Sequence, residues 1–202
     1  MNSQPNYTLI GSFTSPYARK MRLLLFNMGV YEFKSINYME KTDSDYLKSI
    51  NPLNQIPILL DGTTKVFDSR IIYNYLAKKH NFKPLTVEEE NILSAIDTAL
   101  DTSINLFSLR RGGTDINDKT NYYLERQRER VPLILNYLTP WVKKQNHTIP
   151  EHLNFLKMSL YSYLYWGIYR EILDLNDFPE HREFLEHFKN APGVQETTPP
   201  PL

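Results

Sequence analysis

The sequence predicts an α/β domain followed by an all-helical domain. Up to about residue 82, short β-like runs alternate with helical runs, and beyond that point nearly every apolar pattern has the helical period. The change falls at His80-Asn81-Phe82-Lys83-Pro84. A chain of 202 residues is long enough for two small domains. We therefore expect an α/β domain over residues 1–82 and a helical domain over residues 83–202.

The first domain is expected to open with a βαβ unit. Tyr7 to Phe13 has the composition of a strand, and Thr14-Ser15-Pro16 then supplies a hydroxyl cap with proline at the first helical position. The helix that follows is amphipathic, and Gly29 is placed to end it in a left-handed conformation. Glu32 to Tyr38 is the second strand, which we expect to run parallel to the first because a helix connects the two.

The first domain is expected to end with a helix, a hairpin and a second helix. Asp43 to Ile50 is a short helical stretch. Ile56 to Leu60 and Lys65 to Phe67 flank the turn sequence Asp61-Gly62-Thr63-Thr64, which is typical of an antiparallel hairpin. Asp68-Ser69 then caps another helix. The predicted order is βαβαββα.

Four helices are expected in the second domain. Thr86 and Glu89 have the spacing of a capping box at the start of the first helix, which ends at Arg111-Gly112-Gly113. The others are expected over Asn117–Trp141 with a kink at Pro132, over Asn154–Leu173, and from Pro179 to just before Ala191. The proline-rich stretch from Thr197 to Leu202 has no periodic pattern, and we expect it to be extended over the surface or loose.

The composition excludes several classes of function. Because 23 Lys and Arg balance 23 Asp and Glu, nucleic acid and anionic membranes are not expected partners. The balance is uneven along the chain: residues 1–82 hold 10 basic and 6 acidic residues, so the first domain favours an anionic ligand. The absence of cysteine excludes disulfides, thiolate zinc sites and a cysteine nucleophile, and no metal is expected.

The localisation expected from the sequence is cytoplasmic. Residues Met1 to Pro5 are polar and show no export signal. The most apolar long stretch, Phe155 to Leu173, contains charged residues that a bilayer core would penalise.

Three candidate binding segments follow from the element order. Thr14 and Ser15 stand at a helix N-terminus, where a hydroxyl can help to hold an anion such as a thiolate, or can simply cap the helix. Gln55-Ile56-Pro57 puts a proline at the start of a strand. A cis bond there would expose the Ile56 backbone to an extended peptide, although trans is the commoner isomer. Asp68 and Ser69 can bind an ammonium and a carboxylate, or only cap their helix.

With these segments at one end of a sheet, the sequence resembles the cytosolic glutathione S-transferase family, in particular its small bacterial members with a serine-type N-terminal motif. The matching stretches are Gly11-Ser12-Phe13-Thr14-Ser15-Pro16-Tyr17-Ala18-Arg19-Lys20, Asn51-Pro52-Leu53-Asn54-Gln55-Ile56-Pro57-Ile58-Leu59, Phe67-Asp68-Ser69-Arg70-Ile71-Ile72, and the end from Asp177-Phe178-Pro179 to Ala191-Pro192-Gly193-Val194-Gln195-Glu196-Thr197. The resemblance implies a thioredoxin-like N-terminal domain, a helical transferase C-terminal domain, glutathione as co-substrate, and a homodimer.

The resemblance also implies roles for individual residues. Ser15, or its neighbour Thr14, would donate a hydrogen bond to the glutathione sulfur. The bond before Pro57 would be cis, and Ile56, next to Gln55, would pair with the cysteinyl part. The glutathione-binding residues implied are Gln55, Ile56, Pro57, Asp68, Ser69 and Arg111, with Asp68 and Ser69 at the γ-glutamyl end and Arg111 at a carboxylate.

Two features of the second domain stand out against the family pattern. The family commonly has Ser/Thr-x-x-Asp at the start of its third helix, where this chain has Asn154-Phe155-Leu156-Lys157 and lacks the reciprocal capping box. The helix that follows is rich in aromatic residues. We expect them to fill the core, and the alternative is a hydrophobic wall for the electrophile. They are Tyr161, Tyr163, Tyr165, Trp166 and Tyr169.

The sequence thus favours an enzyme that conjugates the glutathione thiolate to a small hydrophobic electrophile. One alternative is a catalytically inactive binding or regulatory protein of the same fold. Another is a glutathione-dependent peroxidase or disulfide reductase. Ser15-Pro16-Tyr17-Ala18 occupies the place of a C-x-x-C motif, so the chain forms no mixed disulfide of its own and the reductase alternative loses support.

Overall fold

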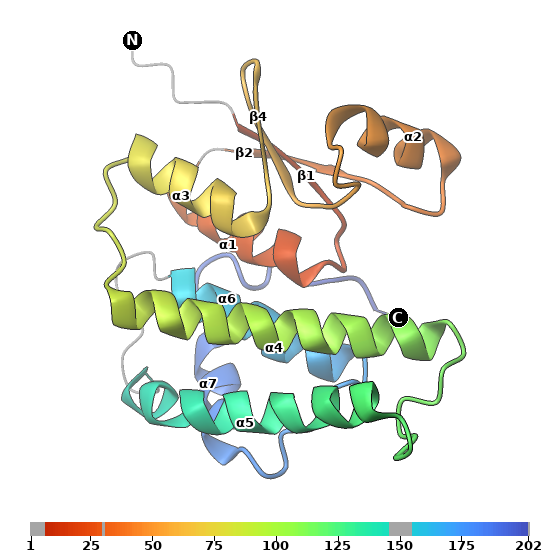
Figure 1. The fold of residues 1–202 in the computed structure, drawn as a ribbon. Coiled ribbons are helices and arrows are strands. Elements are labelled where there is room, and N and C mark those ends of the chain that lie inside the picture. Colours follow the sequence, from red (N-terminus) through yellow and green to blue (C-terminus); the bar gives the residue numbers. More distant parts are fainter. Residues whose placement is uncertain (1–6, 30, 146–154, 202) are drawn as a thin grey trace. The chain divides into compact units, whose positions relative to one another are not determined.

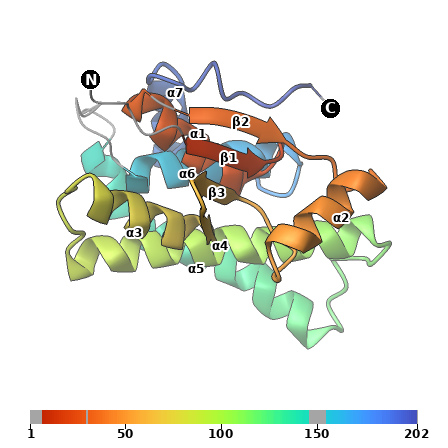
Figure 2. The ribbon, with the colours of Figure 1, turned by 90° about the horizontal axis from the view of Figure 1, so that it is seen from above.

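The computed structural model of the protein describes residues 7–29, 31–145 and 155–201 (Figures 1 and 2). The chain forms two compact units: Met1–Pro84 with Pro192–Leu202, and Leu85–Ala191. We had expected the helical domain to extend to residue 202, but the structure places the segment after residue 191 with the α/β unit. The cause is that Arg19 and Arg22, both buried in the first unit, donate hydrogen bonds to main-chain carbonyl groups of this segment.

The first unit has the predicted thioredoxin-like order βαβαββα. Its strands form one mixed sheet in the order β2-β1-β3-β4. β1 and β2 are parallel, and β3 is antiparallel to both β1 and β4, as expected for a βαβ unit followed by a hairpin. The elements are β1 (Tyr7–Gly11), α1 (Pro16–Met28), β2 (Tyr31–Ser35), α2 (Lys41–Ile50), β3 (Ile58–Asp61), β4 (Thr64–Phe67) and α3 (Ser69–Lys79).

Helices cover the apolar residues of the sheet in the first unit. α1 and α3 pack against each other and against the strands (Figure 2). Ile10 of β1 and Ile58 of β3 instead cluster with Ile36 and with Leu47 of α2. The predicted end of α1 is confirmed: Gly29 has φ 83° and its N–H donates to the carbonyl groups of the last turn. α1 is therefore fixed in length, and its N-terminus stands at the end of β1.

The second unit consists of α4 (Val87–Arg111), α5 (Tyr122–Gln145), α6 (Phe155–Tyr169) and α7 (Pro179–Phe188). α6 contacts both α4 and α7 and is buried on nearly all sides from Phe155 to Leu164. Tyr161, Tyr163 and Trp166 are buried, so these three aromatic residues fill the core as expected. In residues 7–29, 31–145 and 155–201, no helix has both the length and the hydropathy of a membrane span.

Two helix boundaries of the second unit differ from expectation, the start of α5 and the end of α6. α5 starts at Tyr122, because Asn121 accepts hydrogen bonds on its side chain from the next N–H groups, and it continues as one helix through Pro132. α6 ends at Tyr169. Glu171 turns the chain with a φ of 52°, and the Gly167 carbonyl then accepts hydrogen bonds from the N–H groups of Ile172 and Leu173. Asn154 lies outside the described residues, so the missing capping box stays a prediction.

Candidate functional site

Three segments of the first unit meet at one end of its sheet. Ile10 of β1 pairs with Ile58 of β3, and Ile58 pairs with Phe67 of β4. The C-terminal ends of β1 and β4 therefore lie beside the N-terminal end of β3. The residues just beyond these strand ends are those singled out from the sequence: Thr14 and Ser15, Ile56 and Pro57, and Asp68 and Ser69.

Ser15 is the N-cap of α1. Its hydroxyl oxygen accepts a hydrogen bond from the Ala18 N–H at 3.2 Å, and its side chain is half-buried. The preceding turn is closed by the Ser15 N–H, which donates to the Ser12 carbonyl. Thr14 is placed differently, because its hydroxyl lies 3.3 Å from the hydroxyl of Ser12. Of the two hydroxyl groups, that of Ser15 is the one at the N-terminus of the helix, where the helix dipole favours an anion.

The peptide bond between Ile56 and Pro57 is cis. Pro57 is buried, Ile56 half-buried and Gln55 exposed. The loop before them is held by Asn51, whose side chain is buried. Its Nδ2 donates to the Gln55 carbonyl at 2.8 Å, and its Oδ1 accepts from the Leu53 N–H at 2.9 Å. This role of Asn51 was not predicted from the sequence, although an asparagine before a turn is a known signal for such a contact.

Asp68 is the N-cap of α3 and has an unusual backbone conformation. Its Oδ1 accepts from the N–H groups of Arg70 at 2.8 Å and Ile71 at 3.1 Å. Its φ of 75° lies in the left-handed region, which is uncommon for a residue with a side chain, and residues in such strained conformations cluster at active sites and ligand clamps. Asp68 is exposed, whereas Ser69 beside it is buried. The acid therefore faces solvent at a helix N-terminus.

Arg111, the remaining predicted site residue, is the last residue of α4 in the second unit and is exposed. Its neighbour Arg110 donates to the main-chain carbonyl groups of Arg170 at 2.6 Å and Glu171 at 2.7 Å, so that side chain holds the turn after α6. The predicted role of Arg111 at a carboxylate stays a prediction.

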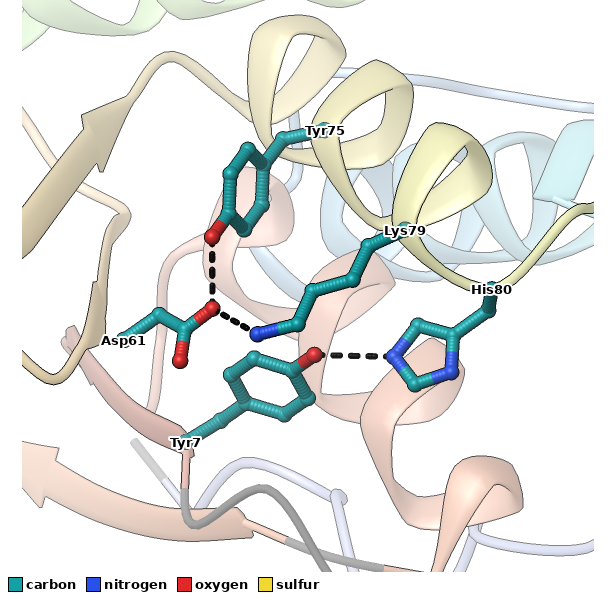
Figure 3. Close-up of polar contacts among 5 residues, drawn as sticks. All are labelled: Tyr7, Asp61, Tyr75, Lys79 and His80. Carbon is teal, nitrogen blue, oxygen red and sulfur yellow. Dashed lines mark hydrogen bonds and ion pairs between the residues drawn. The ribbon is translucent and has the colours of Figure 1, made fainter.

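A second polar cluster lies at the opposite end of the same sheet (Figure 3). The Tyr75 hydroxyl donates to the Asp61 carboxylate at 2.5 Å, and Lys79 forms an ion pair with the same oxygen. Hydrogen bonds from Lys79 and Tyr75 lower the pKa of the Asp61 carboxyl. The hydroxyl of Tyr7 lies 2.8 Å from Nε2 of His80. This cluster fastens the end of α3 to β1 and β3 and is separate from the three segments described above.

No group suited to a metal ion was found in the described part of the chain: there, no three His, Asp or Glu side chains gather as ligands.

The comparisons with known proteins agree on one family. The model of the glutathione S-transferase N-terminal domain matches residues 5–78. Glutathione S-transferase Mu 1 of Macaca fascicularis is 26% identical over 186 residues, which are 88% of this chain and 83% of that protein. The uncharacterized GST-like protein YibF of Escherichia coli strain K12 is 29% identical over 137 residues, 64% of this chain and 67% of that protein.

The fold is also shared with solved structures. A glutathione S-transferase of Methylobacterium radiotolerans, solved in complex with glutathione sulfonate, superimposes with a TM-score of 0.80 at 21% identity. The match covers 96% of this chain and 95% of that one. The domain match shows that residues 5–78 belong to the glutathione S-transferase N-terminal domain family, and the relatives and the shared fold extend this likeness over most of the chain.

Proposed function

We propose that the protein binds glutathione at the sheet end formed by Ser15, Ile56-Pro57 and Asp68-Ser69, and transfers its thiolate to a small hydrophobic electrophile. The observation that carries the proposal is the meeting of these three segments within the first unit. Glutathione has three parts with different chemistry, and each segment is suited to one of them.

The cysteinyl part is assigned to Ile56. This residue lies two positions before the first paired residue of β3, and Pro57 has no N–H to donate to the sheet. An extended peptide can pair with the main chain of Ile56 as a further strand. The buried Asn51 supports this assignment, because it fixes the Gln55 carbonyl on the preceding residue.

The γ-glutamyl part is assigned to Asp68 and Ser69. The N–H groups at the start of α3 and the Ser69 hydroxyl suit the α-carboxylate. Asp68 uses Oδ1 for its helix and is exposed, so the carboxylate can also accept from the α-ammonium. A left-handed φ at this position is consistent with a backbone held in place for binding.

The sulfur is assigned to Ser15. A serine hydroxyl that accepts from the Ala18 N–H still has its own proton to donate, and it stands where the helix dipole is positive. Donation to the bound sulfur stabilises the thiolate over the thiol. Each unit by which the thiol pKa falls corresponds to about 1.4 kcal/mol, which is within the range of one charge-assisted hydrogen bond.

On the family resemblance we further propose that the enzyme is a cytoplasmic homodimer. Sedimentation of the purified protein over a range of concentrations tests the dimer, and a monomer at all concentrations would contradict it.

Calorimetric titration with glutathione, followed by a conjugation assay with an aryl halide, tests the main proposal. Binding with turnover is the expected result. Absence of binding at millimolar glutathione would contradict the whole assignment, because a dissociation constant above about 1 mM corresponds to a binding free energy weaker than about 4 kcal/mol. Binding without turnover on a panel of aryl, alkyl and peroxide substrates would contradict the transferase reaction and favour a protein that only binds glutathione.

A further inference from the structure

The C-terminal segment, residues 192–201, runs along α1 in the first unit (Figure 1). Asn27 of α1 donates from its side chain to the Pro192 carbonyl at 3.1 Å. Gly193 lies so close to Phe26 that a Cβ at this position would be 2.8 Å from the ring. The Thr197 N–H donates back to the Gly193 carbonyl, and Thr197 is fully buried. The segment up to this residue is therefore packed and hydrogen-bonded.

Two buried arginines of α1 bind this segment. Arg22 is 4% exposed and donates from its two terminal nitrogens to the carbonyl groups of Thr197 at 3.1 Å and Glu196 at 3.0 Å. Arg19 is 2% exposed and donates to the Val194 carbonyl at 3.3 Å. A guanidinium keeps its charge in a protein, so its burial requires acceptors. In this unit the C-terminal segment supplies several of them as main-chain oxygens.

Arg22 also contacts the loop that precedes Ser15. Its guanidinium carbon is 5.1 Å from the centroid of the Phe13 ring and 4.5 Å from that of Phe33 on β2. The two rings pack edge to face at 5.1 Å. Phe13 is only two residues before Ser15, and both belong to the turn between β1 and α1. Arg22 thus connects the C-terminal segment with the turn that carries the proposed sulfur ligand.

We propose that the C-terminal segment and Arg22 position the Ser15 hydroxyl for the glutathione sulfur. Arg22 is a positioning residue: it acts through Phe13 and touches no substrate. The inference rests on the proposed function of Ser15. Its physical basis is that stabilisation of a developing or bound charge is lost when a hydrogen-bond donor moves by about half an ångström to one ångström. Without the carbonyl groups of residues 194–197, the guanidinium would turn toward water and release the Phe13 ring.

The test compares wild type with Arg22→Lys and with a chain lacking residues 194–202. Lysine keeps the charge but has neither the planar group that stacks on two rings nor the fork that reaches two carbonyl groups. We expect the pKa of the bound glutathione thiol, followed by thiolate absorbance in a pH titration, to rise by about one unit in both proteins. The affinity for S-methylglutathione, which has no thiol proton, is expected to stay unchanged.

Three comparisons give the experiment its controls. Arg126→Lys alters an exposed arginine on α5 and is expected to leave the thiol pKa as in wild type. A peptide of residues 194–201 added to the shortened chain is expected to lower the thiol pKa again. If the shortened chain does not fold, Arg22→Lys and Phe13→Leu still test the inference, because neither variant removes the segment.

The outcomes separate the two proposals. A wild-type protein that does not bind glutathione contradicts the proposed function itself. A wild-type protein that binds it, with the same thiol pKa in Arg22→Lys and Phe13→Leu, contradicts the positioning role alone. Equal losses of affinity for glutathione and S-methylglutathione, with no change in the thiol pKa, also contradict it, because that pattern is the one expected from general damage to the unit.

Discussion

The hydroxyl oxygen of Ser15 accepts the hydrogen bond of the Ala18 N–H at 3.2 Å. A serine hydroxyl has two acceptor lone pairs and one donor, and the cap uses only one lone pair. Capping α1 and donating to a bound thiolate are therefore compatible in one side chain. From the sequence alone the two roles are alternatives, whereas the geometry of the cap leaves room for both.

Substitutions of Ser15 can separate these roles. Ser15→Ala removes both, so we expect a loss of about 1 kcal/mol in the free energy of unfolding together with a higher pKa of the bound thiol. Ser15→Asp keeps a good cap but places a negative charge beside the sulfur. This variant should retain its stability and yet raise the thiol pKa further. Chemical denaturation and pH titration of the bound thiolate measure the two effects.

Ser15→Thr is the matched control, because it keeps both the cap and the donor. If Ser15→Ala keeps the wild-type thiol pKa and conjugation rate, Ser15 does not stabilise the thiolate. That role would then belong to Thr14 or to the main-chain amides of α1.

Gly11 allows α1 to approach the end of β1 closely. A Cβ at Gly11 would be 2.7 Å from the Ala18 Cβ and 3.2 Å from the Phe33 ring. The Ala18 Cβ is attached to the helix backbone and cannot move alone. We expect Gly11→Ala to lower the free energy of unfolding by about 1–3 kcal/mol, the usual cost of overpacking, and to weaken glutathione binding because it moves the first turn of α1.

Gly112→Ala is the control for Gly11→Ala. There the added Cβ would meet backbone oxygens only at 3.4 Å, and φ is −78°, which alanine adopts readily. Thermal unfolding of the two variants provides the comparison. Equal stability of Gly11→Ala and wild type would contradict the close packing described here.

Asp68 is predicted to recognise the ammonium group of the γ-glutamyl part. Asp68→Asn keeps a good N-cap and tolerates a left-handed φ, so the free energy of unfolding should change by less than about 0.5 kcal/mol. The loss of the charged acceptor should weaken glutathione binding about tenfold or more, since hydrogen bonds to charged groups contribute about 1.5–3 kcal/mol. Calorimetry measures the affinity.

Cysteinylglycine lacks the γ-glutamyl part and is the control ligand for Asp68→Asn. Its affinity should be the same for wild type and variant. An equal loss for both ligands would show that Asp68 acts on the fold of the site and not on the ammonium group.

Most of the first unit could be predicted because its signals are local. The left-handed end of α1 at Gly29 and the cap at Asp68 are observed where the sequence indicated them, and in the second unit so is the capping box of Thr86 and Glu89. The strand order followed from the same reasoning, since a helix returns the chain in parallel and a two-residue turn returns it antiparallel. These features depend on residues a few positions apart.

The features of the first unit that could not be predicted from the residues alone depend on contacts made in the folded chain. Arg19 and Arg22 are charged residues that a sequence pattern assigns to solvent, yet both are buried and donate hydrogen bonds to a segment more than 170 residues later. The cis bond before Pro57 is a similar case, because local preference favours trans and only the family resemblance implied cis. The contact of Asn51 with Gln55 also required the folded loop.

His181 on α7 is a buried titratable group away from the candidate site. It is fully buried, and among the described residues neither ring nitrogen has a hydrogen-bond partner. The Phe178 ring packs edge-on against it at 5.8 Å. Burial lowers the pKa of His181 to about 4 from its usual 6.5, and the nearby Glu180 only partly opposes this shift.

The buried neutral His181 should make the second unit sensitive to acid. Because its folded-state pKa is depressed, the unfolded chain takes up the proton first as the pH falls below about 6.5. The contribution of this group is fully present above that pH and is lost progressively down to about pH 4, by on the order of 3 kcal/mol. We expect His181→Leu to flatten the pH dependence of the free energy of unfolding in this window, as measured by urea denaturation. The matched control is Phe184→Leu, a buried position on the same helix with no titratable group, which should lower the free energy of unfolding without changing its pH dependence. An identical slope in wild type and His181→Leu would mean that the ring is hydrated or protonated in the folded protein, contrary to the burial observed.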